Sequence, residues 1–338
     1  MARIVQESDL KDVHIIGEGA FGTVSRAVFY SDRFPKTVAI KKLTNFNFMN
    51  QLDFEKEYNY LVMLQSGSAC NGIIELVGKV CYPESTRPKM IILKYYEGGC
   101  IDKFVRQYSS TSVTTKRDVV LALLSDVQRG LVLLHTHNVL HMDIKPENML
   151  VTHQIGHRPR AVLSDFGLAT PLHPQGFNTT NFCGTPMYMA PEVEMGFYEI
   201  SEDNRYDLKA DVYSFGKASK DVWKSAFRLF APSQLRPKWI DHCMSLDPWD
   251  RPDLASLVIQ HKCRSGAWCM KGTTCLFQHD VVSPPEVPIK AQEVVSLPEI
   301  PIKVREVVSL LEVSIKAQEV VASPRVPIRA AVPVVHGL

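Results

Sequence analysis

The eight residues from His141 to Asn148, HMDIKPEN, constrain this 338-residue chain more than any other stretch. They place an acid, a cation and an amide at fixed offsets: Asp143, Lys145 and Asn148. A run of apolar residues at helical spacing over 117–137 precedes the stretch. The strand-like sequence NMLV begins at its last residue, Asn148. Near a phosphate, the carboxylate can accept a hydroxyl proton, the amine can neutralise charge, and the amide oxygen can hold a metal ion.

Size and composition fit an ordinary globular protein. Hydrophobic residues make up 45% of the chain and charged residues 22%, and about 150 residues per domain predicts roughly two domains. The net charge of +2 gives no basis for a nucleic-acid or membrane partner. The N-terminus lacks an apolar signal segment, and no run of 18 uncharged apolar residues occurs. We therefore expect an intracellular protein, cytoplasmic or nuclear, that is not secreted and has no membrane partner.

Residues 13–43 alternate apolar and polar side chains, which predicts a hairpin followed by a third strand. Gly17, Gly19 and Gly22 form a GxGxxG turn, where missing Cβ atoms let backbone N–H groups approach phosphate oxygens. The same string opens a dinucleotide-binding helix in other folds. Here a strand continues instead, and Lys41 closes its VAIK sequence, which favours a loop that covers nucleotide phosphates.

Three more motifs follow this hairpin. Residues 52–64 have helical spacing, with Phe54, Leu61 and Leu64 on one side and Glu55 and Glu57 available as partners for a cation. The sequence AVLSDFGLAT at 161–170 places a carboxylate, Asp165, after a predicted strand. CGTPMYMAPE at 183–192 ends a segment rich in Gly, Pro, Asn and Thr.

In this order, the motifs resemble those of eukaryotic-type Ser/Thr protein kinases over about residues 1–260. The resemblance implies an α+β fold of two lobes, with a β-rich N-lobe over 1–97 and a mostly helical C-lobe over 98–260. It also implies transfer of the γ-phosphoryl group of ATP, with Mg²⁺ or Mn²⁺, to Ser or Thr hydroxyls of protein substrates.

The resemblance assigns roles to individual residues. Asp143, Lys145, Lys41 and Thr185 are the expected catalytic residues, with Thr185 bridging Asp143 and Lys145. The residues expected to bind the nucleotide or its Mg²⁺ are Gly17, Gly19, Gly22, Val24, Ala39, Lys41, Glu57, Leu93, Tyr96, Asn148 and Asp165. Within this set, Asn148 and Asp165 hold the metal ion, and Glu57 pairs with Lys41. Leu93 guards the back of the pocket, and the backbone of 94–96 contacts the adenine edge.

Further residues are expected to support this site. His141 is expected to be a packed core histidine, and Asp211 is expected to accept N–H bonds from the catalytic loop. Arg251 matches an arginine of the family that pairs with Glu192. Only 34 residues separate Gly216 from Arg251, so we expect a compact C-lobe that lacks a substrate-docking helix common in the family.

One departure from the family concerns regulation. Met142 stands where the family usually has Arg, in HMD in place of HRD. Thr179 and Thr180 are the candidate phosphorylation sites of the segment that follows Asp165. A phosphate orders a loop chiefly by pairing with Arg, so we predict that activity does not depend on phosphorylation of these threonines.

Residues 261–280 resemble a CCCH zinc finger. Cys263, Cys269, Cys275 and His279 have C-x5-C-x5-C-x3-H spacing, and three thiolates and one imidazole satisfy tetrahedral Zn²⁺. An unstructured cysteine-containing tail and disulfides remain alternatives. Aromatic and basic residues could give weak contact with single-stranded RNA, and a protein contact is the alternative.

Residues 281–338 contain repeats of 13 residues, such as PEVPIKAQEVVSL, broken by prolines and without aromatic residues. This composition predicts a disordered tail. Two other functions remain open for the whole chain. A pseudokinase scaffold would keep the fold without turnover, and an RNA-binding regulator would act through the finger.

Overall fold

The computed structural model describes residues 3–19, 22–31, 34–43, 48–65, 72–81, 88–109, 113–153, 158–198, 204–227 and 236–259. The chain divides into two units, Met1–His279 and Asp280–Leu338, and every described residue belongs to the first. The four zinc-ligand candidates and the repeats therefore lie outside the described residues.

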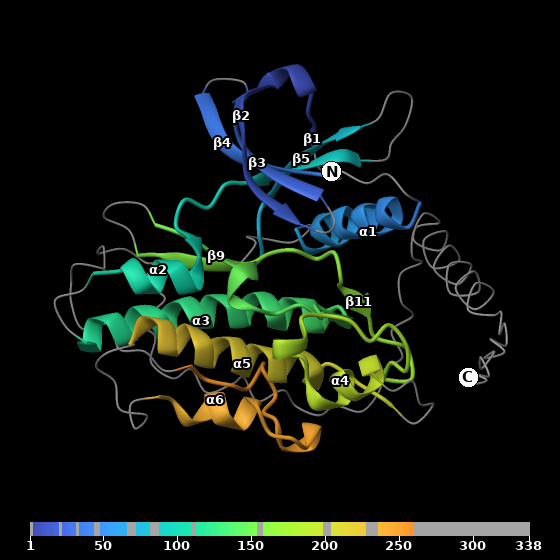
Figure 1. Ribbon diagram of the computed structural model, residues 1–338, viewed down its shortest axis with the longest axis vertical. Helices are drawn as coiled ribbons and strands as arrows, with labels where there is room; N and C mark the ends of the chain where they lie inside the picture. The colour runs from blue at the N-terminus through green and yellow to red at the C-terminus, as the bar shows by residue number, and fades with distance from the viewer. Residues whose placement is uncertain are drawn as a thin grey trace, which may run out of the picture. The chain divides into compact units, whose positions relative to one another are not determined.

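Six strands form one sheet in the order β1-β5-β6-β4-β3-β2 (Figure 1). The strands are β1 (Arg3–Ile4), β2 (Leu10–Gly19), β3 (Gly22–Ser31), β4 (Phe34–Lys42), β5 (Leu76–Cys81) and β6 (Pro88–Lys94). Neighbouring strands are antiparallel except β1 and β5, which are parallel. The hairpin and third strand predicted over 13–43 are confirmed as β2, β3 and β4. The parallel edge strand β1 was not predicted.

Both faces of this sheet bury apolar side chains. Helix α1 (Phe48–Leu64) buries Phe54, Leu61 and Leu64, as its spacing predicts, in a core cluster shared with Ile91 and Leu93 of β6. The opposite face buries a second cluster, formed by Val5, Leu10, Ala27, Phe29, Val38, Ile40, Val80, Met90 and Ile92. Strands with two buried faces can hold side chains rigidly on either side.

Helices make up most of the second lobe, below the sheet in Figure 1. They are α2 (Ile101–Gln107), α3 (Val113–Thr136), α4 (Pro191–Tyr198), α5 (Lys209–Ala226) and α6 (Lys238–Cys243). Short strands join them: β7 (Gly99–Cys100), β8 (Val139–Leu140), β9 (Met149–Thr152), β10 (Arg160–Leu163) and β11 (Thr170–Pro171). Strands β7, β9 and β10 form one small sheet, and β8 and β11 form another. The predicted two-lobed α+β architecture is confirmed.

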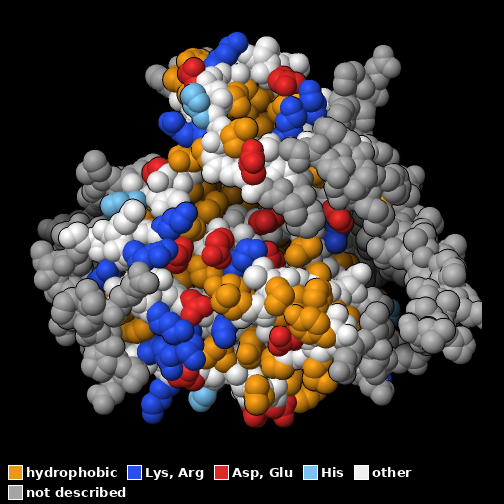
Figure 2. All heavy atoms as spheres, viewed as in Figure 1, with side chains coloured by type: hydrophobic (Ala, Val, Ile, Leu, Met, Phe, Trp, Pro, Cys, Tyr) orange, Lys and Arg blue, Asp and Glu red, His pale blue; other side chains and the backbone are white. Residues whose placement is uncertain are grey.

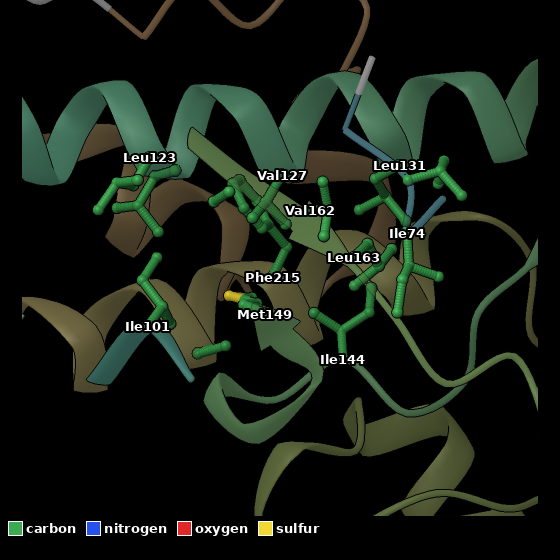
Figure 3. Packing of buried hydrophobic residues seen from close by; sticks show 14 of the residues in the cluster. Ile74, Ile101, Leu123, Val127, Leu131, Ile144, Met149, Val162, Leu163 and Phe215 are labelled. Atoms are coloured by element: carbon green, nitrogen blue, oxygen red, sulfur yellow. The ribbon is translucent and has the colours of Figure 1, made fainter. Parts of the chain in front are cut away.

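Helix α3 is the centre of the second lobe. All six of its residues expected to be buried are at most 1% exposed: Val120, Leu121, Leu124, Val127, Leu131 and Leu134. Figure 3 shows α3 side chains meeting those of β9, β10 and α5, with Leu123, Val127, Leu131, Met149, Val162, Leu163 and Phe215 labelled. Within the described part of the chain, α3 is also long and apolar enough to cross a membrane. Its burial in this core accounts for that composition.

The two lobes meet closely where the chain leaves α1. The Gly72 carbonyl accepts a hydrogen bond from Leu163 N at 2.7 Å, and Ile74 N donates to the Leu163 carbonyl at 2.9 Å. Gly72 has a φ of 91°, and a Cβ there would collide with the α3 backbone at Asp126 and Gly130. A Cβ at Gly130 would collide with the Gly72 carbonyl in turn. The two backbones therefore touch without a side chain between them.

Candidate active site

The catalytic-loop residues converge after β8, where the chain runs through a 3₁₀ turn at Pro146–Asn148 into β9. Lys145 Nζ lies 2.7 Å from Asp143 Oδ2 and donates to Thr185 Oγ1 at 2.9 Å. The Thr185 hydroxyl donates to Asp143 Oδ1 at 2.6 Å. The predicted bridge from Thr185 to Asp143 and Lys145 is confirmed, and it fixes both carboxylate oxygens of Asp143.

Asn148 is buried against the same carboxylate. Its amide nitrogen donates to the Asp143 carbonyl at 2.8 Å and to Asp143 Oδ2 at 3.1 Å. Since the nitrogen makes both contacts, the amide oxygen is the Asn148 atom left for a cation. Amide and carboxylate oxygens are hard ligands of the kind that Mg²⁺ prefers, so Asn148 and Asp165 suit this ion by donor type.

Lys41 of β4 joins the two lobes by charge. Its Nζ lies 2.7 and 2.9 Å from the Glu57 carboxylate oxygens of α1 and 2.8 Å from Asp165 Oδ1. The predicted Lys41–Glu57 pair is confirmed, and Glu55 is not the partner. Burial opposes the charge on Lys41, but the carboxylates of Glu57 and Asp165 outweigh it and raise the pKa of Lys41. This amine is therefore a permanent cation between two carboxylates.

The two carboxylates beside Lys41 differ in environment. The Glu57 side chain is 3% exposed, and burial raises its pKa although Lys41 opposes the change. The Asp165 side chain is 42% exposed. Burial also acts to raise the pKa of Asp165, but the charge and hydrogen bond of Lys41 prevail and lower it. Asp165 is thus an ionised, accessible carboxylate at a positive φ of 65°, which suits a metal ligand.

His141 is a packed core residue, as predicted. It is fully buried, its ring meets Phe166 edge-on at 5.1 Å between centroids, and Nε2 lies 3.1 Å from the Ser164 carbonyl. Asp143 N donates to Nδ1 at 3.3 Å, so Nε2 carries the proton that Ser164 accepts. Burial lowers the pKa of His141, against the attraction of Asp211 and other carboxylates. A neutral imidazole therefore supports the loop.

Asp211 of α5 anchors the loop backbone. Its Oδ2 accepts His141 N at 2.7 Å and its Oδ1 accepts Met142 N at 3.0 Å, which confirms the predicted role. Oδ2 also lies 3.0 Å from His135 Nε2 at the end of α3, a partner that the motif did not predict. The Asp211 side chain is 1% exposed, so these contacts replace its hydration.

Met142 lies in an apolar cluster. The cluster contains Met142, Leu140, Met189, Ala190, Val193, Tyr206 and Ala210, with Phe182 and Cys183 packed at its edge. Met142 has a φ of 67°, and its carbonyl faces Gly184, where a Cβ would collide with the carbonyl oxygen. Gly184 itself has a φ of 126°. Only glycine fits there. Gly184 of the CGTP motif therefore allows the backbone of the activation segment to lie close to the Met142 carbonyl of the catalytic loop, a role that we did not predict.

The activation segment, residues 165–192, is held by an aromatic pair that sequence reasoning missed. Phe182 occupies the space that a side chain at Gly196 of α4 would fill, and its ring lies 5.2 Å from that of Tyr206. The Tyr206 hydroxyl donates to the Thr180 carbonyl at 2.7 Å. Tyr206 and Asn178 also exchange two backbone hydrogen bonds, at 2.8 and 3.0 Å. A periodic pattern could not have revealed these contacts, because they join separate loops.

Arg251 fastens the end of this segment. Its guanidinium forms the predicted ion pair with Glu192, and the pair is bidentate, with N–O distances of 2.6 and 2.8 Å. It also donates to the carbonyls of Ser245 and Lys209, at 2.9 and 3.0 Å, and lies over the Tyr213 ring. The Arg251 side chain is fully buried, so the pair is a geometric constraint as well as an attraction.

Among the residues expected to bind the nucleotide, those in strands β3, β4 and β6 share one face of the sheet. Val24 lies opposite Lys41, and Ala39 lies opposite Leu93, in adjacent strand pairs. Gly17 lies opposite Val24, and Gly19 lies opposite Gly22, so these glycines frame the β2–β3 turn, whose tip is outside the described residues. The Tyr96 side chain is buried and accepts Glu75 N at 3.4 Å, so Tyr96 can offer only backbone to a ligand.

The front surface combines these charges with an apolar patch. Figure 2 shows Lys, Arg, Asp and Glu side chains in the middle of the face, and hydrophobic side chains gathered over α4. Four exposed hydrophobic residues belong to α4 and the turn before it: Met187, Met195, Phe197 and Tyr198.

In the described ranges, no group of three or more His, Cys, Asp or Glu residues could hold a metal ion. The predicted zinc ligands lie beyond those ranges.

Comparison with known proteins agrees with this geometry. Residues 10–226 match the model of the protein kinase domain family. The chain is 32% identical over 218 residues to serine/threonine-protein kinase dst4 of Dictyostelium discoideum, covering 64% of this chain and 41% of that protein. It is 28% identical over 230 residues to human serine/threonine-protein kinase ULK1, covering 66% and 20%.

A third relative is the probable LRR receptor-like serine/threonine-protein kinase RPK1 of Arabidopsis thaliana. It is 34% identical over 206 residues, which cover 60% of this chain and 34% of that protein. The matched regions thus span less than half of each of these three relatives. The family match covers well over half of the chain and includes the Lys41, Asp143 and Asp165 motifs. The chain therefore belongs to the protein kinase domain family.

Proposed function

We propose that this protein transfers the γ-phosphoryl group of ATP to Ser or Thr hydroxyls of protein substrates. One observation carries the proposal: two charge networks are assembled together in the same structure. Lys41 is joined to Glu57 and Asp165, while Asp143 is joined to Lys145 and Thr185. The names of the relatives, which are serine/threonine-protein kinases, support the class of acceptor.

Each residue in the two networks has a role in the proposed reaction. Asp143 orients the acceptor hydroxyl and takes its proton as the oxygen bonds to the γ-phosphorus and the bond to the β-phosphate oxygen breaks. Lys145 stabilises the charge of the transferring group, and Thr185 holds both residues in place. Lys41 holds the α- and β-phosphates. Asn148 and Asp165 would bind Mg²⁺, which supplies positive charge for the phosphates when it is bound.

A pseudokinase scaffold is the main alternative. Such proteins commonly lose the lysine or one of the two aspartates of the site. Here Lys41, Asp143 and Asp165 are all present, and each is held by the partner that phosphoryl transfer needs. The geometry therefore favours an enzyme.

The test is transfer of label from ATP. Purified full-length protein is incubated with labelled ATP, Mg²⁺ and a generic basic protein, beside the Asp143→Asn variant. We expect the variant to lose activity by about 1,000-fold or more, because it lacks the group that accepts the proton. Nucleotide binding and thermal unfolding serve as controls for folding. Equal labelling by both proteins would rule out the proposed enzyme.

We propose separately that Cys263, Cys269, Cys275 and His279 bind structural Zn²⁺. The C-x5-C-x5-C-x3-H spacing supports this proposal, since three thiolates and an imidazole make a complete tetrahedral set. Contact of this module with single-stranded RNA or with a protein is a weaker extension. Metal analysis of the full chain should find one zinc per molecule, and Cys269→Ser should reduce it. Absence of zinc from the parent protein would remove the module and the RNA-binding alternative together.

A further inference from the structure

Three arginine side chains converge on one buried carboxylate where helix α3 packs on strand β10. The carboxylate belongs to Asp126 of α3, whose side chain is fully buried. Its Oδ1 accepts hydrogen bonds from Arg129, one turn later in α3, and from Arg158, at 2.9 Å. Its Oδ2 accepts Arg160 Nε at 3.0 Å and the backbone N–H of Ala161 at 3.2 Å. Four donors fill the acceptor sites of one carboxylate, so Asp126 is fully occupied.

The arginine cluster, which we define as Asp126, Arg129, Arg158 and Arg160, is not electrically balanced. It holds three positive charges and one negative charge, a net charge of +2. Burial, and then the charges of Arg160 and Arg158, lower the pKa of Arg129 to about 10, and burial lowers the pKa of Arg160. All three guanidiniums remain charged at neutral pH. They therefore repel one another around a carboxylate that compensates only one of them.

The packing of α3 on β10 does not require this excess of positive charge. Apolar side chains of both elements already meet in the core, as Figure 3 shows for Val127, Leu131, Val162 and Leu163. One arginine would be enough to compensate the charge of Asp126. A second and a third arginine at the same place add repulsion, which an anion bound among them would remove. The excess charge is thus better explained by a ligand than by the fold.

Two of the three arginines are accessible to a ligand. The Arg129 side chain is 36% exposed and the Arg160 side chain 34%, against 15% for Arg158. In the part of the chain that the structure describes, Asp126 is the only acceptor for the Arg129 and Arg160 side chains. A guanidinium has five N–H donors, so both keep most of them for a ligand. Both belong to regular elements, α3 and β10, which hold them in position beforehand.

We propose that the arginine cluster binds a phosphate dianion, either the phosphate group of a phosphorylated side chain or free phosphate. Its charge of about −1.5 to −2 at pH 7 nearly balances the net charge of the cluster, and its oxygens suit bidentate bonds from guanidiniums. A carboxylate carries less charge. A nucleic-acid backbone needs cations spread along a strand, whereas these surround one carboxylate. None of the three arginines is assigned to catalysis or nucleotide binding, so this binding does not require the proposed phosphoryl transfer.

The test uses full-length protein and a fluorescein-labelled peptide of eight residues, with one phosphoserine among glycines and alanines. Fluorescence anisotropy measures its dissociation constant, and inorganic phosphate is added as a competitor. We expect Arg129→Gln with Arg160→Gln to weaken binding by about tenfold or more. Arg106→Gln with Arg236→Gln is the matched control, because each of these arginines pairs with a carboxylate outside the cluster, and it should bind as the parent does. Tighter binding of the peptide than of phosphate would identify a phosphorylated protein segment as the ligand, and equal binding would identify free phosphate.

A second variant separates ligand binding from folding. Asp126→Asn removes the one negative charge of the cluster, so phosphate should raise its midpoint temperature of unfolding by more than it raises that of the parent. A cluster with a purely structural role would lose stability in this variant and show no response to phosphate, which would overturn the proposal. The proposal would also fail if the parent did not bind the phosphopeptide, or if both paired-arginine variants bound it equally. Equal competition by a glutamate peptide or by single-stranded RNA would contradict a site for a phosphate dianion.

Discussion

The catalytic loop and the activation segment touch each other but are held by different forces. The loop is held by charge: the buried Asp211 carboxylate accepts two of its backbone N–H groups, and Lys145 is paired with Asp143. Residues 170–184 of the segment, all of them described, form no ion pair with other described residues. Phe182, Tyr206, neutral hydrogen bonds and the Arg205 guanidinium, which lies 4.5 Å from the centroid of the Phe177 ring, hold this part of the segment instead.

This difference explains what replaces the missing arginine. In a loop that carries Arg before its aspartate, that cation would need a phosphate on the activation segment to compensate its charge. Met142 instead completes the apolar cluster beneath Phe182 and Met189 without any modification. The fixed charge on Asp211 and this packing together assemble the site. Lys145, the cation of the loop, is already paired with Asp143, so a phosphate on the segment has no arginine of the loop to recruit.

Removing the charge that holds the loop should have the largest effect. Asp211→Ala would leave several buried donors without an acceptor, so we expect the free energy of unfolding to fall by about 3–5 kcal/mol and labelling to fall by about 100-fold or more. Urea unfolding and the labelled-ATP assay measure the two effects. Asp241→Ala, which removes an exposed partner of Arg236, is the control and should cost about 0.5 kcal/mol or less. Similar losses in both variants would contradict the anchoring role of Asp211.

Placing a charge in the apolar cluster should have the next largest effect. Met142→Arg would bury part of a guanidinium without a carboxylate or phosphate partner, so we expect a loss of about 2–3 kcal/mol in stability and about tenfold in activity. Met142→Leu, with similar volume and no charge, should cost less than about 1.5 kcal/mol. A Met142→Arg protein as stable and active as the parent would show that packing at this position does not assemble the site.

Shortening the aromatic contact should have a moderate effect. Phe182 is half-buried, so Phe182→Ala should lower the free energy of unfolding by about 1–3 kcal/mol and loosen the segment over α4. We expect kcat/KM for a protein substrate to fall more than the affinity for ATP, because Phe182 contacts α4 and Tyr206 and not the Lys41, Glu57 and Asp165 network. Phe182→Leu should restore most of the loss. An equal loss of both parameters would indicate general unfolding.

Removing the candidate phosphorylation sites should have the smallest effect. Thr179 and Thr180 are exposed, and the Tyr206 hydroxyl contacts only the Thr180 carbonyl, which alanine keeps. The variant with Thr179→Ala and Thr180→Ala should therefore keep its activity within about twofold. The protein should be assayed with and without prior phosphatase treatment. Loss of activity with unchanged stability would show that the segment depends on phosphate after all.

Sequence reasoning predicted the charged contacts of the site well. Lys41 with Glu57, Arg251 with Glu192, and Asp211 with the loop backbone were all found as expected. The resemblance to the kinase family implied these contacts, because its motifs name both partners. Burial explains why they form, since a buried charged group needs a counter-ion or hydrogen-bond donors. The alternating and helical patterns likewise located β2 to β4, α1 and α3.

The contacts that were not predicted are packing contacts between apolar side chains and the pairing of a short edge strand. Phe182 could pack in many places, and its position over Gly196 follows from the path of two loops that have no periodic pattern. The edge strand β1 is only two residues long and pairs with β5, which follows it only after three other strands and a helix.

The contact of Gly72 with Gly130 has a mechanical consequence. Because the two backbones touch and Gly72 is also hydrogen-bonded to β10, the sheet lobe cannot slide along α3 at this point. We therefore expect the sheet lobe to rotate about the contact of Gly72 with Gly130. Lys41 and Glu57 both belong to the sheet lobe and would move together, whereas Asp165 follows β10 in the second lobe, so a small rotation at this pivot would change the distance from Lys41 to Asp165. Rotation of the sheet lobe and breaking of the Lys41–Asp165 ion pair are thus one motion.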